Sequence, residues 1–271
     1  CSMSWAVRGA LYDDGTYLAP AVPACLTHAA TLLTRYNVAV LWLNDARFLA
    51  GSIDRHLPIL YQLLPDCKVI QFPTTAVTTG SRCQQNNQMG GAIAIITFKW
   101  KSYITSIHRD PMGLGIVNTL DLKLDDYRIR LINVYFLPST ATTGKATLHS
   151  RITRFQHQTT SPAWRKRLSP QDFLFHHAQQ LISKARLNNW FVIVQGDFNR
   201  PILTNSQTLA ALPSWMATNQ LSSPDHTYLH SMPGLHTFNS GGTAQAQTHI
   251  DHTMHTPLPP NILLQATGIV N

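Results

Sequence analysis

The tetrapeptide Gly196-Asp197-Phe198-Asn199 directly follows an apolar run from Trp190 to Val194. In an extended chain the side chains alternate between two faces, so Asp197 and Asn199 point to the same side. Gly196 allows a ligand to come close to the backbone. A carboxylate beside an amide at this spacing could hold a divalent cation or orient an attacking water. A strand that simply ends in an Asx-type turn would have the same residues, and the tetrapeptide alone favours neither interpretation.

A second interior strand ends in a similar way. Residues Val38 to Leu43 are all apolar, which is typical of a strand covered on both faces, and Asn44 and Asp45 follow them. The chain therefore places two carboxylates, Asp45 and Asp197, at the ends of buried strands.

The composition indicates a folded domain with a basic surface. Of the 271 residues, 44% are hydrophobic and only 13% are charged, about half the usual charged share of roughly 25%. The formal charge of +8 favours a polyanionic partner. The four cysteines lie far apart with no CxxC spacing, which is typical of reduced residues in an intracellular protein. No apolar stretch approaches ~20 residues, so we expect no membrane span.

Hydrophobic periodicity predicts alternating helices and strands, followed by hairpins. We expect helices over Cys25 to Tyr36, Asp54 to Leu64 and Ser169 to about Leu187. Strands are expected over Ser4 to Leu11, Val38 to Leu43, Gly90 to Phe98, Ile116 to Leu124, Tyr127 to Tyr135, Trp190 to Val194, His236 to Phe238 and Thr248 to Met254. Ser169 is the expected N-cap of the last helix, and His176 and His177 are expected on its exposed face. The pattern predicts one α/β domain, a two-sheet sandwich with helices outside.

The segment from Ser139 to Leu168 is basic and polar, and we expect a long loop or insertion there. Its candidate nucleic-acid contacts are Arg151, Arg154, Trp164, Arg165, Lys166 and Arg167. Cationic side chains neutralise phosphates, and a tryptophan can stack on a base. An ordinary solvated loop has the same composition, so charge alone leaves both interpretations open.

Five segments, spread over nearly the whole chain, together resemble one superfamily. They are Trp5-Ala6-Val7-Arg8-Gly9, Leu41-Trp42-Leu43-Asn44-Asp45-Ala46-Arg47, Asn133-Val134-Tyr135, Gly196-Asp197-Phe198-Asn199 and His249-Ile250-Asp251-His252. In their order and spacing they resemble the endonuclease/exonuclease/phosphatase superfamily. Within it they are most similar to the apurinic-type endonuclease domain of non-LTR retrotransposons. The resemblance implies a four-layer α-β-β-α sandwich of two mixed sheets with flanking helices.

The resemblance also implies a reaction, which is phosphodiester hydrolysis assisted by Mg²⁺ or Mn²⁺, here the nicking of DNA. Asp45 would hold the metal with support from Asn44. Asp197 would orient or deprotonate the attacking water, because a carboxylate near a phosphate can accept its proton. Asn199 would donate to the phosphate or hold Asp197 in place, and Tyr135 would donate to a phosphate oxygen. Asp251 would orient a histidine.

The chain also departs from the family pattern. Ala6 replaces the usual Asn of the opening strand, Asp45 replaces a longer Glu, and no closing Ser-Asp-His motif follows Asp251. A second hypothesis is therefore a catalytically degenerate module of the same fold that binds nucleic acid or a protein. A third is a phosphatase that acts on a phosphorylated inositol or lipid.

Further expectations concern the parent protein. The chain begins at Cys1, which suggests a fragment of a longer polyprotein. As a retroelement endonuclease it would be a monomeric domain fused to a reverse transcriptase, would contact DNA but no membrane, and would be nuclear.

Overall fold

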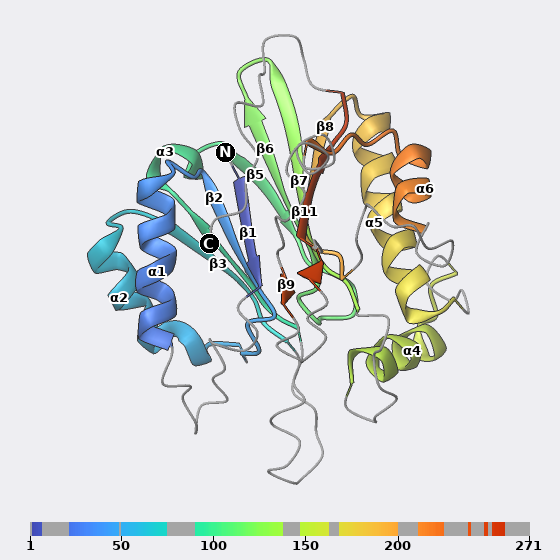
Figure 1. Cartoon of the computed structure of the whole chain (residues 1–271), viewed down its shortest axis with the longest axis horizontal. Helices are drawn as coiled ribbons and strands as arrows, with labels where there is room; N and C mark the ends of the chain where they lie inside the picture. The colour runs from blue at the N-terminus through green and yellow to red at the C-terminus, as the bar shows by residue number, and fades with distance from the viewer. Residues whose placement is uncertain are drawn as a thin grey trace, which may run out of the picture.

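The elements of the computed structural model form four layers, in which helices cover the outer faces of two sheets (Figure 1). The structure describes residues 2–6, 22–48, 50–74, 90–137, 147–162, 168–199, 211–224, 238–239, 247–248 and 251–257. This arrangement confirms the predicted fold class.

The first sheet has four strands in the order β1-β2-β4-β3. Their bounds are Ser2–Ala6 for β1, Val40–Asn44 for β2, Lys68–Phe72 for β3 and Ala92–Ile96 for β4. The β1 and β2 strands are parallel, whereas β4 runs antiparallel to both β2 and β3, so the sheet is mixed. Asn44 at the end of β2 pairs with Ala92 at the start of β4, which places the residues before β4 beside Asp45.

The second sheet has five strands in the order β11-β8-β7-β6-β5. Their bounds are Ile104–His108 for β5, Val117–Leu124 for β6, Tyr127–Tyr135 for β7, Phe191–Asp197 for β8 and Asp251–His255 for β11. Only the β7–β8 pair in this sheet is parallel. The predicted hairpin between β6 and β7 is confirmed. A separate short pair joins β9 (Phe238–Asn239) to β10 (Gln247–Thr248).

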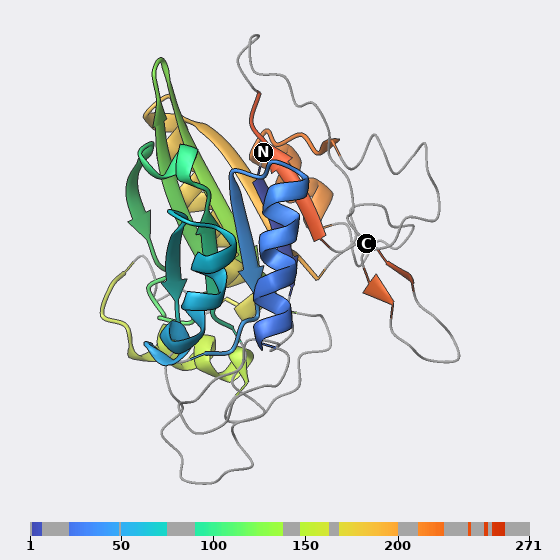
Figure 2. The ribbon, with the colours of Figure 1, turned by 90° about the vertical axis from the view of Figure 1, so that its left-hand side faces the viewer.

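Apolar side chains fill the space between the sheets and the space under each helical layer. The inter-sheet core contains Trp42 of β2, Leu131 of β7 and Ile193 of β8. Helix α1 (Val22–Arg35) and helix α2 (Leu57–Leu63), which follows the 3₁₀ turn η1 (Ser52–His56), cover the four-stranded sheet (Figure 2). Helices α5 (Pro170–Leu187) and α6 (Ala211–Thr218) cover the five-stranded sheet. The short helix α3 (Phe98–Lys101) lies between β4 and β5, where the chain passes from one sheet to the other.

Helix α5 begins at the predicted N-cap, but one of its two histidines is buried where both were expected to be exposed. The Ser169 hydroxyl accepts a hydrogen bond of 3.1 Å from the Asp172 N–H, which confirms the N-cap. The predicted exposure of the histidine pair was wrong for His177, which is 5% exposed. His177 lies one helical turn after Phe173, on the stripe that packs against the sheet, because side chains four residues apart share a face.

The segment expected as a long loop contains a helix instead. Helix α4 spans Leu148–Gln158, and Thr147 caps its first turn by accepting a 3.3 Å bond from the Ser150 N–H. Leu148 and Ile152 are buried against the core under α5. Phe155 of the same helix also packs on this core, against Phe173 of α5. The expectation of a loop was therefore wrong for this part of the segment, which a narrow apolar stripe holds as a helix.

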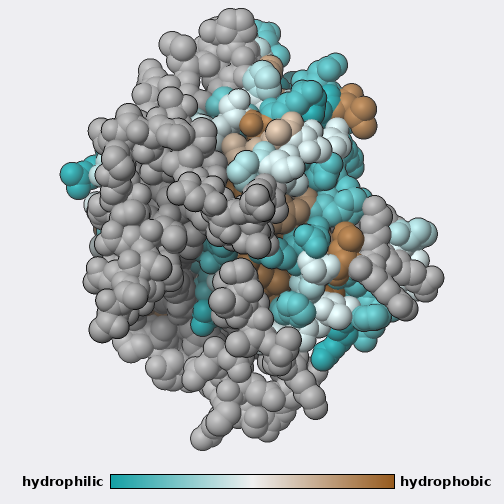
Figure 3. Space-filling view, turned by 45° about the vertical axis from the view of Figure 1, so that its right-hand side comes forward, coloured by the Kyte–Doolittle hydropathy of each residue, from teal (hydrophilic) through white to brown (hydrophobic). Residues whose placement is uncertain are grey.

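Hydrophobic and hydrophilic residues alternate in small patches on the described part of the face in Figure 3. Leu187 at the end of α5 is the most exposed large hydrophobic residue among those described. No described helix combines the length and the hydrophobicity needed to cross a membrane.

Candidate active site

Three of the predicted site residues form one row across the five-stranded sheet. Tyr135 of β7 pairs with Asp197 of β8, which in turn pairs with Asp251 of β11. Residues directly opposite each other on neighbouring strands share a face. That face points toward the other sheet, because Leu131 and Ile193, at even spacings along the same strands, lie in the inter-sheet core. The phenol and the two carboxylates therefore lie together at the ends of β7 and β8.

Asp45 lies in the turn that follows β2 and is 1% exposed. Its backbone is left-handed, with φ 52°, and Arg47 is also left-handed, with φ 55°. Two backbone hydrogen bonds hold this turn: Ala46 N–H donates to Gly91 C=O at 3.0 Å, and Arg47 N–H donates to Gly90 C=O at 2.9 Å. Left-handed conformations in non-glycine residues cost free energy, so the bonds to Gly90 and Gly91 help to hold this turn in place.

The Asp45 carboxylate is bonded by a cation from its own chain. Arg47 donates from Nε to Oδ1 at 3.0 Å and from Nη2 to Oδ2 at 2.7 Å, and the Gly90 N–H donates to Oδ1 at 3.0 Å. This is the bidentate arrangement that guanidinium and carboxylate groups favour. Arg47 is a site residue that the sequence analysis missed. The available signal was a basic residue two positions after the strand-end acid.

The Tyr135 hydroxyl bonds to Asp45 and lies close enough to Asp197 to respond to its charge. Burial raises the pKa of Tyr135 well above its usual range, and the negative charges of Asp45 and Asp197 and a hydrogen bond with Asp45 raise it further. Both carboxylates are thus close enough to act on one hydroxyl, although they come from different sheets. Tyr135 therefore keeps its proton at neutral pH and can serve only as a hydrogen-bond donor to an anion.

Asn44 lies beneath this group and pairs with a second amide. Its Nδ2 donates to Asn133 Oδ1 at 3.1 Å, and Asn133 Nδ2 donates to Asn44 Oδ1 at 2.6 Å. Both side chains are fully buried. The reciprocal pair joins β2 of one sheet to β7 of the other, close to the strand ends that carry Asp45 and Tyr135. It therefore helps to hold these two site residues next to each other.

Asp197 and Asn199 form a compact turn at the end of β8. The Asn199 N–H donates to Asp197 Oδ1 at 2.8 Å, and Asn199 Nδ2 donates to Phe136 C=O at 2.7 Å. This is an Asx-type turn. The turn fixes the carboxylate and attaches it to the end of β7. The two interpretations of the tetrapeptide are therefore compatible.

Gly196 is required by the contact between β7 and β8. Its φ is 139°, and a Cβ at this position would lie 2.0 Å from the Val134 carbonyl oxygen. No side chain fits there, so the close approach of the two strands depends on glycine.

The side-chain oxygens of Asp45 and Asn44, the two predicted ligands of the cation, already accept hydrogen bonds from other groups of the protein. Asp45 accepts two hydrogen bonds from Arg47 and one from the Gly90 N–H, besides its bond with Tyr135, and Asn44 is bonded to Asn133. Among the described residues, no group of three or more His, Cys, Asp or Glu side chains could hold a metal ion. In this arrangement the two predicted ligands do not fit a bound Mg²⁺ or Mn²⁺.

The candidate nucleic-acid contacts are described only in part. Arg151 of α4 donates from Nη1 to Thr74 Oγ1 at 3.0 Å, and burial lowers its pKa while the charge of Asp110 opposes that effect. Arg154 is exposed on the same helix. The other four predicted contacts, Trp164, Arg165, Lys166 and Arg167, lie outside the described residues.

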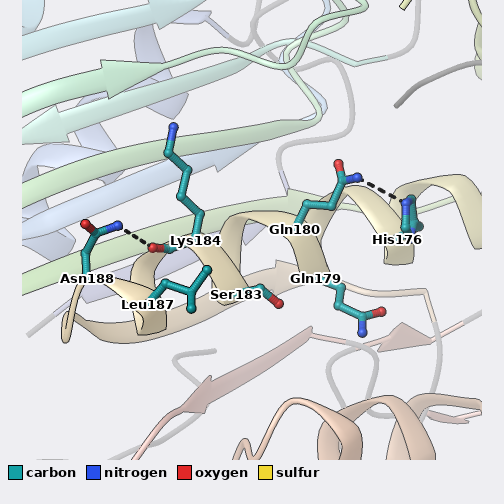
Figure 4. Close-up of a pocket in the computed structure, with 7 residues that line it drawn as sticks. All are labelled: His176, Gln179, Gln180, Ser183, Lys184, Leu187 and Asn188. Atoms are coloured by element: carbon teal, nitrogen blue, oxygen red, sulfur yellow. Dashed lines mark hydrogen bonds between the residues drawn. The ribbon is translucent and has the colours of Figure 1, made fainter. Parts of the chain in front are cut away.

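An open hollow lies elsewhere, along the exposed side of α5 (Figure 4). It is lined by His176, Gln179, Gln180, Ser183, Lys184, Leu187 and Asn188. Two hydrogen bonds join residues of this lining, one of 3.1 Å between the Gln180 and His176 side chains and one of 2.7 Å from Asn188 Nδ2 to the Lys184 carbonyl. Because α5 ends where β8 begins, the hollow lies toward the opposite end of β8 from Asp197.

Comparisons with known proteins identify the fold through structure and not through sequence. No protein-family model matches the chain, and no curated protein is significantly similar to it in sequence. Three similar solved structures are the AP endonuclease LMAP from Leishmania major, the 3′ phosphatase NExo from Neisseria bound to a product DNA hairpin, and truncated TDP2 from Caenorhabditis elegans.

The likeness to all three extends over nearly the whole chain. LMAP has a TM-score of 0.61 at 13% identity over 94% of this chain and 78% of that chain. NExo has a TM-score of 0.59 at 12% identity, with coverages of 94% and 86%. TDP2 has a TM-score of 0.53 at 12% identity, with coverages of 94% and 83%. Identities this low support a statement about fold, and the fold is that of the endonuclease/exonuclease/phosphatase superfamily.

Proposed function

We propose that this chain hydrolyses phosphodiester bonds in DNA as the nicking endonuclease of a retroelement. The observation that carries the proposal is the meeting of Tyr135, Asp45 and Asp197 at the joined ends of the two sheets. Two proteins with a similar fold, by their names, are an AP endonuclease and a 3′ phosphatase bound to product DNA. The retroelement assignment rests on the order of the sequence motifs.

The buried groups suit the handling of a phosphate and a water. Asp197 accepts the proton of the attacking water, because the Asx-type turn fixes its Oδ1 and the carboxylate is only 6% exposed. The Tyr135 hydroxyl, which bonds to Asp45 in this structure, would turn its one proton to a phosphate oxygen when substrate binds. Asn199 holds Asp197 in place, and Asp251 lies next to it in the row as a supporting acid.

The proposal includes Mg²⁺ or Mn²⁺ because the resemblance implies one. We assign no step to the cation, since the described bonds engage Asp45 and Asn44. The proposal also places DNA along the exposed basic side of α4, joins the chain to a reverse transcriptase and locates it in the nucleus.

A nicking assay on supercoiled plasmid with Mg²⁺ tests the proposal. We expect the wild-type chain to relax the plasmid and Asp197→Ala to lower the rate by roughly 10²- to 10⁴-fold, the usual contribution of a positioned base. Asp126→Ala is the matched control, because Asp126 is exposed in the β6–β7 turn, at the other end of β7 from Tyr135. Equal rates for Asp197→Ala and the wild type would remove Asp197 from the mechanism.

One observation favours a second candidate, a non-catalytic DNA-binding module. The Arg47–Asp45 pair neutralises the carboxylate that the resemblance assigns to the metal. A chain that binds a DNA duplex but leaves plasmid intact at every Mg²⁺ and Mn²⁺ concentration would support this candidate over the first.

A further inference from the structure

Helix α3 and the turn after it present two aromatic side chains to solvent, away from the candidate active site. Phe98 is 58% exposed, and Tyr103 is 37% exposed. Neither belongs to the apolar clusters that form the described cores. Strand β4 begins at Ala92, which pairs with Asn44, and ends at Ile96, so α3 follows at the far end of that strand from Asn44. The two rings therefore serve neither the core nor the candidate active site.

The backbone that carries these rings is firmly held. Thr97 donates to the Ala39 C=O from its N–H at 3.1 Å and from its hydroxyl at 3.3 Å. The Tyr103 N–H donates to the Trp100 C=O at 3.2 Å, and the Tyr103 C=O accepts from the Lys123 N–H at 2.8 Å. Trp100 packs against the inter-sheet core, with its ring centre 5.8 Å from that of Tyr103. Because the segment is anchored in advance, a partner that binds here loses little entropy in ordering it.

Lysines alternate with the aromatic residues on this surface. Lys99 and Lys101 lie between Phe98 and Tyr103 in the chain, and the Lys101 ammonium is 4.7 Å from the centre of the Phe98 ring. Lys68, the first residue of β3, pairs with the last residue of β4 and adds a third cation beside α3. The described elements β3, α3 and β5 contain no acidic residue. We call these five residues the α3 surface, and its charge favours an anionic partner.

Single-stranded nucleic acid has the chemistry that matches both features of the α3 surface. Its phosphates pair with lysines, and its unpaired bases stack on aromatic side chains. A duplex keeps its bases stacked inside and would use the lysines alone. Strands β3 and β5 form the edges of the two sheets on the same flank of the molecule (Figure 2), and an edge strand can also pair with another protein. Lysines on an edge oppose such pairing, so the charges favour the nucleic acid.

We propose that the α3 surface binds single-stranded nucleic acid, with bases stacked on its two aromatic rings and phosphates neutralised by its three lysines. This is a second nucleic-acid site, at the other end of the sandwich from Asp45 and Asp197. The inference goes beyond the proposed nuclease function and does not rest on it, because a chain that cuts nothing can hold a strand here.

Fluorescence anisotropy with labelled oligonucleotides tests the inference. The probes are oligothymidylate and oligouridylate of roughly 12 nucleotides, within the usual size range of single-strand sites. EDTA is present, so that no cation-assisted cleavage shortens them. We expect the wild type to bind at least one probe, and long-chain polyphosphate, which has the charges but no bases, to compete poorly at equal phosphate concentration. The probe that binds more tightly identifies the sugar that the surface prefers.

Variants of Phe98 separate stacking from general hydrophobicity. Phe98→Ala should weaken binding by roughly 5- to 150-fold, the usual effect of removing one stacking side chain. Phe98→Leu keeps an apolar side chain without a flat ring and should bind as weakly as Phe98→Ala. Phe98→Trp keeps a flat ring and should bind at least as tightly as the wild type. Leu187→Ala is the matched control, because Leu187 is the most exposed large hydrophobic residue described and lies on α5 of the other helical layer.

Variants of the charged residues test the phosphate contacts. Lys99→Ala should lower the slope of log affinity against log salt by about 0.7, the contribution of one phosphate contact on a single strand. Lys184→Ala removes an exposed lysine from α5 and should keep the wild-type slope.

A change at Asp66 should increase the affinity. Asp66 is exposed, and its C=O accepts a 3.3 Å bond from the Lys101 ammonium, so this acid lies beside the α3 surface. Asp66→Asn should tighten binding about twofold, because one screened repulsive charge is removed. The backbone at Asp66 is left-handed, with φ 65°, a conformation that asparagine also adopts. Loss of folding cannot produce such a gain.

Three outcomes would overturn the inference. The first is equal binding of the probes by the wild type and by Phe98→Ala, with folding checked by thermal unfolding. The second is polyphosphate that competes as well as an oligonucleotide, which would leave charge alone. The third is no binding of either probe together with self-association that Phe98→Ala abolishes in sedimentation, which would make the surface a protein interface.

The proposed function fails separately from this inference. If strand binding depends on Phe98 but the wild type nicks no plasmid, the inference stands and the nuclease proposal falls. If the wild type nicks plasmid but Phe98→Ala binds both probes as the wild type does, the nuclease proposal stands and the inference falls.

Discussion

At the scale of single residues, the site depends on how each buried polar group finds a partner. Asn44 and Asn133 satisfy each other through two hydrogen bonds of 3.1 and 2.6 Å, with both side chains excluded from water. Such a pair adds little free energy over hydration, but an amide left alone costs the full penalty of its desolvation. The pair therefore sets the register of one sheet against the other more than it stabilises the fold.

We predict that Asn44→Leu lowers the free energy of unfolding by about 1–3 kcal/mol, because Asn133 then loses its partner. Asn133→Leu should cost a similar amount. The double variant should cost clearly less than the sum of the two, since no amide is left unsatisfied. Urea unfolding of the four proteins gives the coupling free energy, and additive values would show that the two amides act independently.

The sequence predicts which residues of the site come at strand ends, and it does not predict their partners. Asp45 and Asp197 could be located because each follows an interior apolar run. The Arg47–Asp45 pair depends on two left-handed backbone conformations and on side-chain rotamers, neither of which the spacing specifies. The Asn44–Asn133 pair depends on the contact between sheets.

At the scale of elements, the β7–β8 contact brings Tyr135 beside Asp197, and Gly196 makes it possible. A Cβ at Gly196 would overlap the Val134 carbonyl at 2.0 Å, whereas a Cβ at Gly51 would meet nothing closer than 3.8 Å. Both glycines have φ in the range that L side chains rarely adopt, 139° and 77°. A side chain at Gly51 would meet only an unfavourable backbone conformation, whereas one at Gly196 would meet a steric clash as well. Substituting each glycine therefore measures the two costs separately.

We predict that Gly51→Ala costs about 1–2 kcal/mol, the penalty of the left-handed conformation alone. Gly196→Ala should cost more than about 3 kcal/mol or leave the chain unfolded, because β7 and β8 must also move apart. Urea unfolding measures both values. Equal costs for the two variants would mean that the strands separate without penalty.

The elements that the sequence did not reveal are those with the weakest hydrophobic pattern. The central strands and α5 were predicted because they carry continuous apolar runs or a clear N-cap. Strands β3 and β5 were missed, and both lie at sheet edges, where one side is unpaired and many side chains are exposed. Helix α4 was missed because only its narrow stripe through Leu148 and Ile152 is apolar and buried.

At the scale of the whole molecule, the site exists because two sheets end at the same place. Asp45 belongs to the end of the four-stranded sheet and Asp197 to the end of the five-stranded sheet, so no short-range pattern joins them. Only the resemblance, read from the order of five distant segments, predicted that they meet. The physical link is the inter-sheet core with Trp42, Leu131 and Ile193, which holds the sheets face to face.

The helical layer over the five-stranded sheet carries a group that should make the stability of the whole fold depend on pH. Burial, together with the charge of the neighbouring His176, lowers the pKa of His177 from its ordinary 6.5 to about 4. The unfolded chain therefore binds a proton at this residue below about pH 6.5, while the folded chain does so only near pH 4. The unfolded state binds more protons in that window, so the free energy of unfolding falls as the pH falls through it.

We predict that the His177 contribution to the free energy of unfolding drops by about 2 kcal/mol between roughly pH 7.5 and pH 5, from the difference between the two pKa values. Burial raises the pKa of Asp121, but hydrogen bonds from Arg130 and Ser106 outweigh it and hold that pKa below its ordinary 3.8. The stability that Asp121 contributes is therefore lost at a lower pH than the window of His177. Urea unfolding across this range should show a shallower pH dependence for His177→Leu than for the wild type. His157→Gln, which replaces an exposed histidine on α4, should keep the wild-type slope. If His177→Leu keeps the wild-type pH dependence, other groups cause that dependence, and His177 binds its proton as readily in the folded chain as in the unfolded chain.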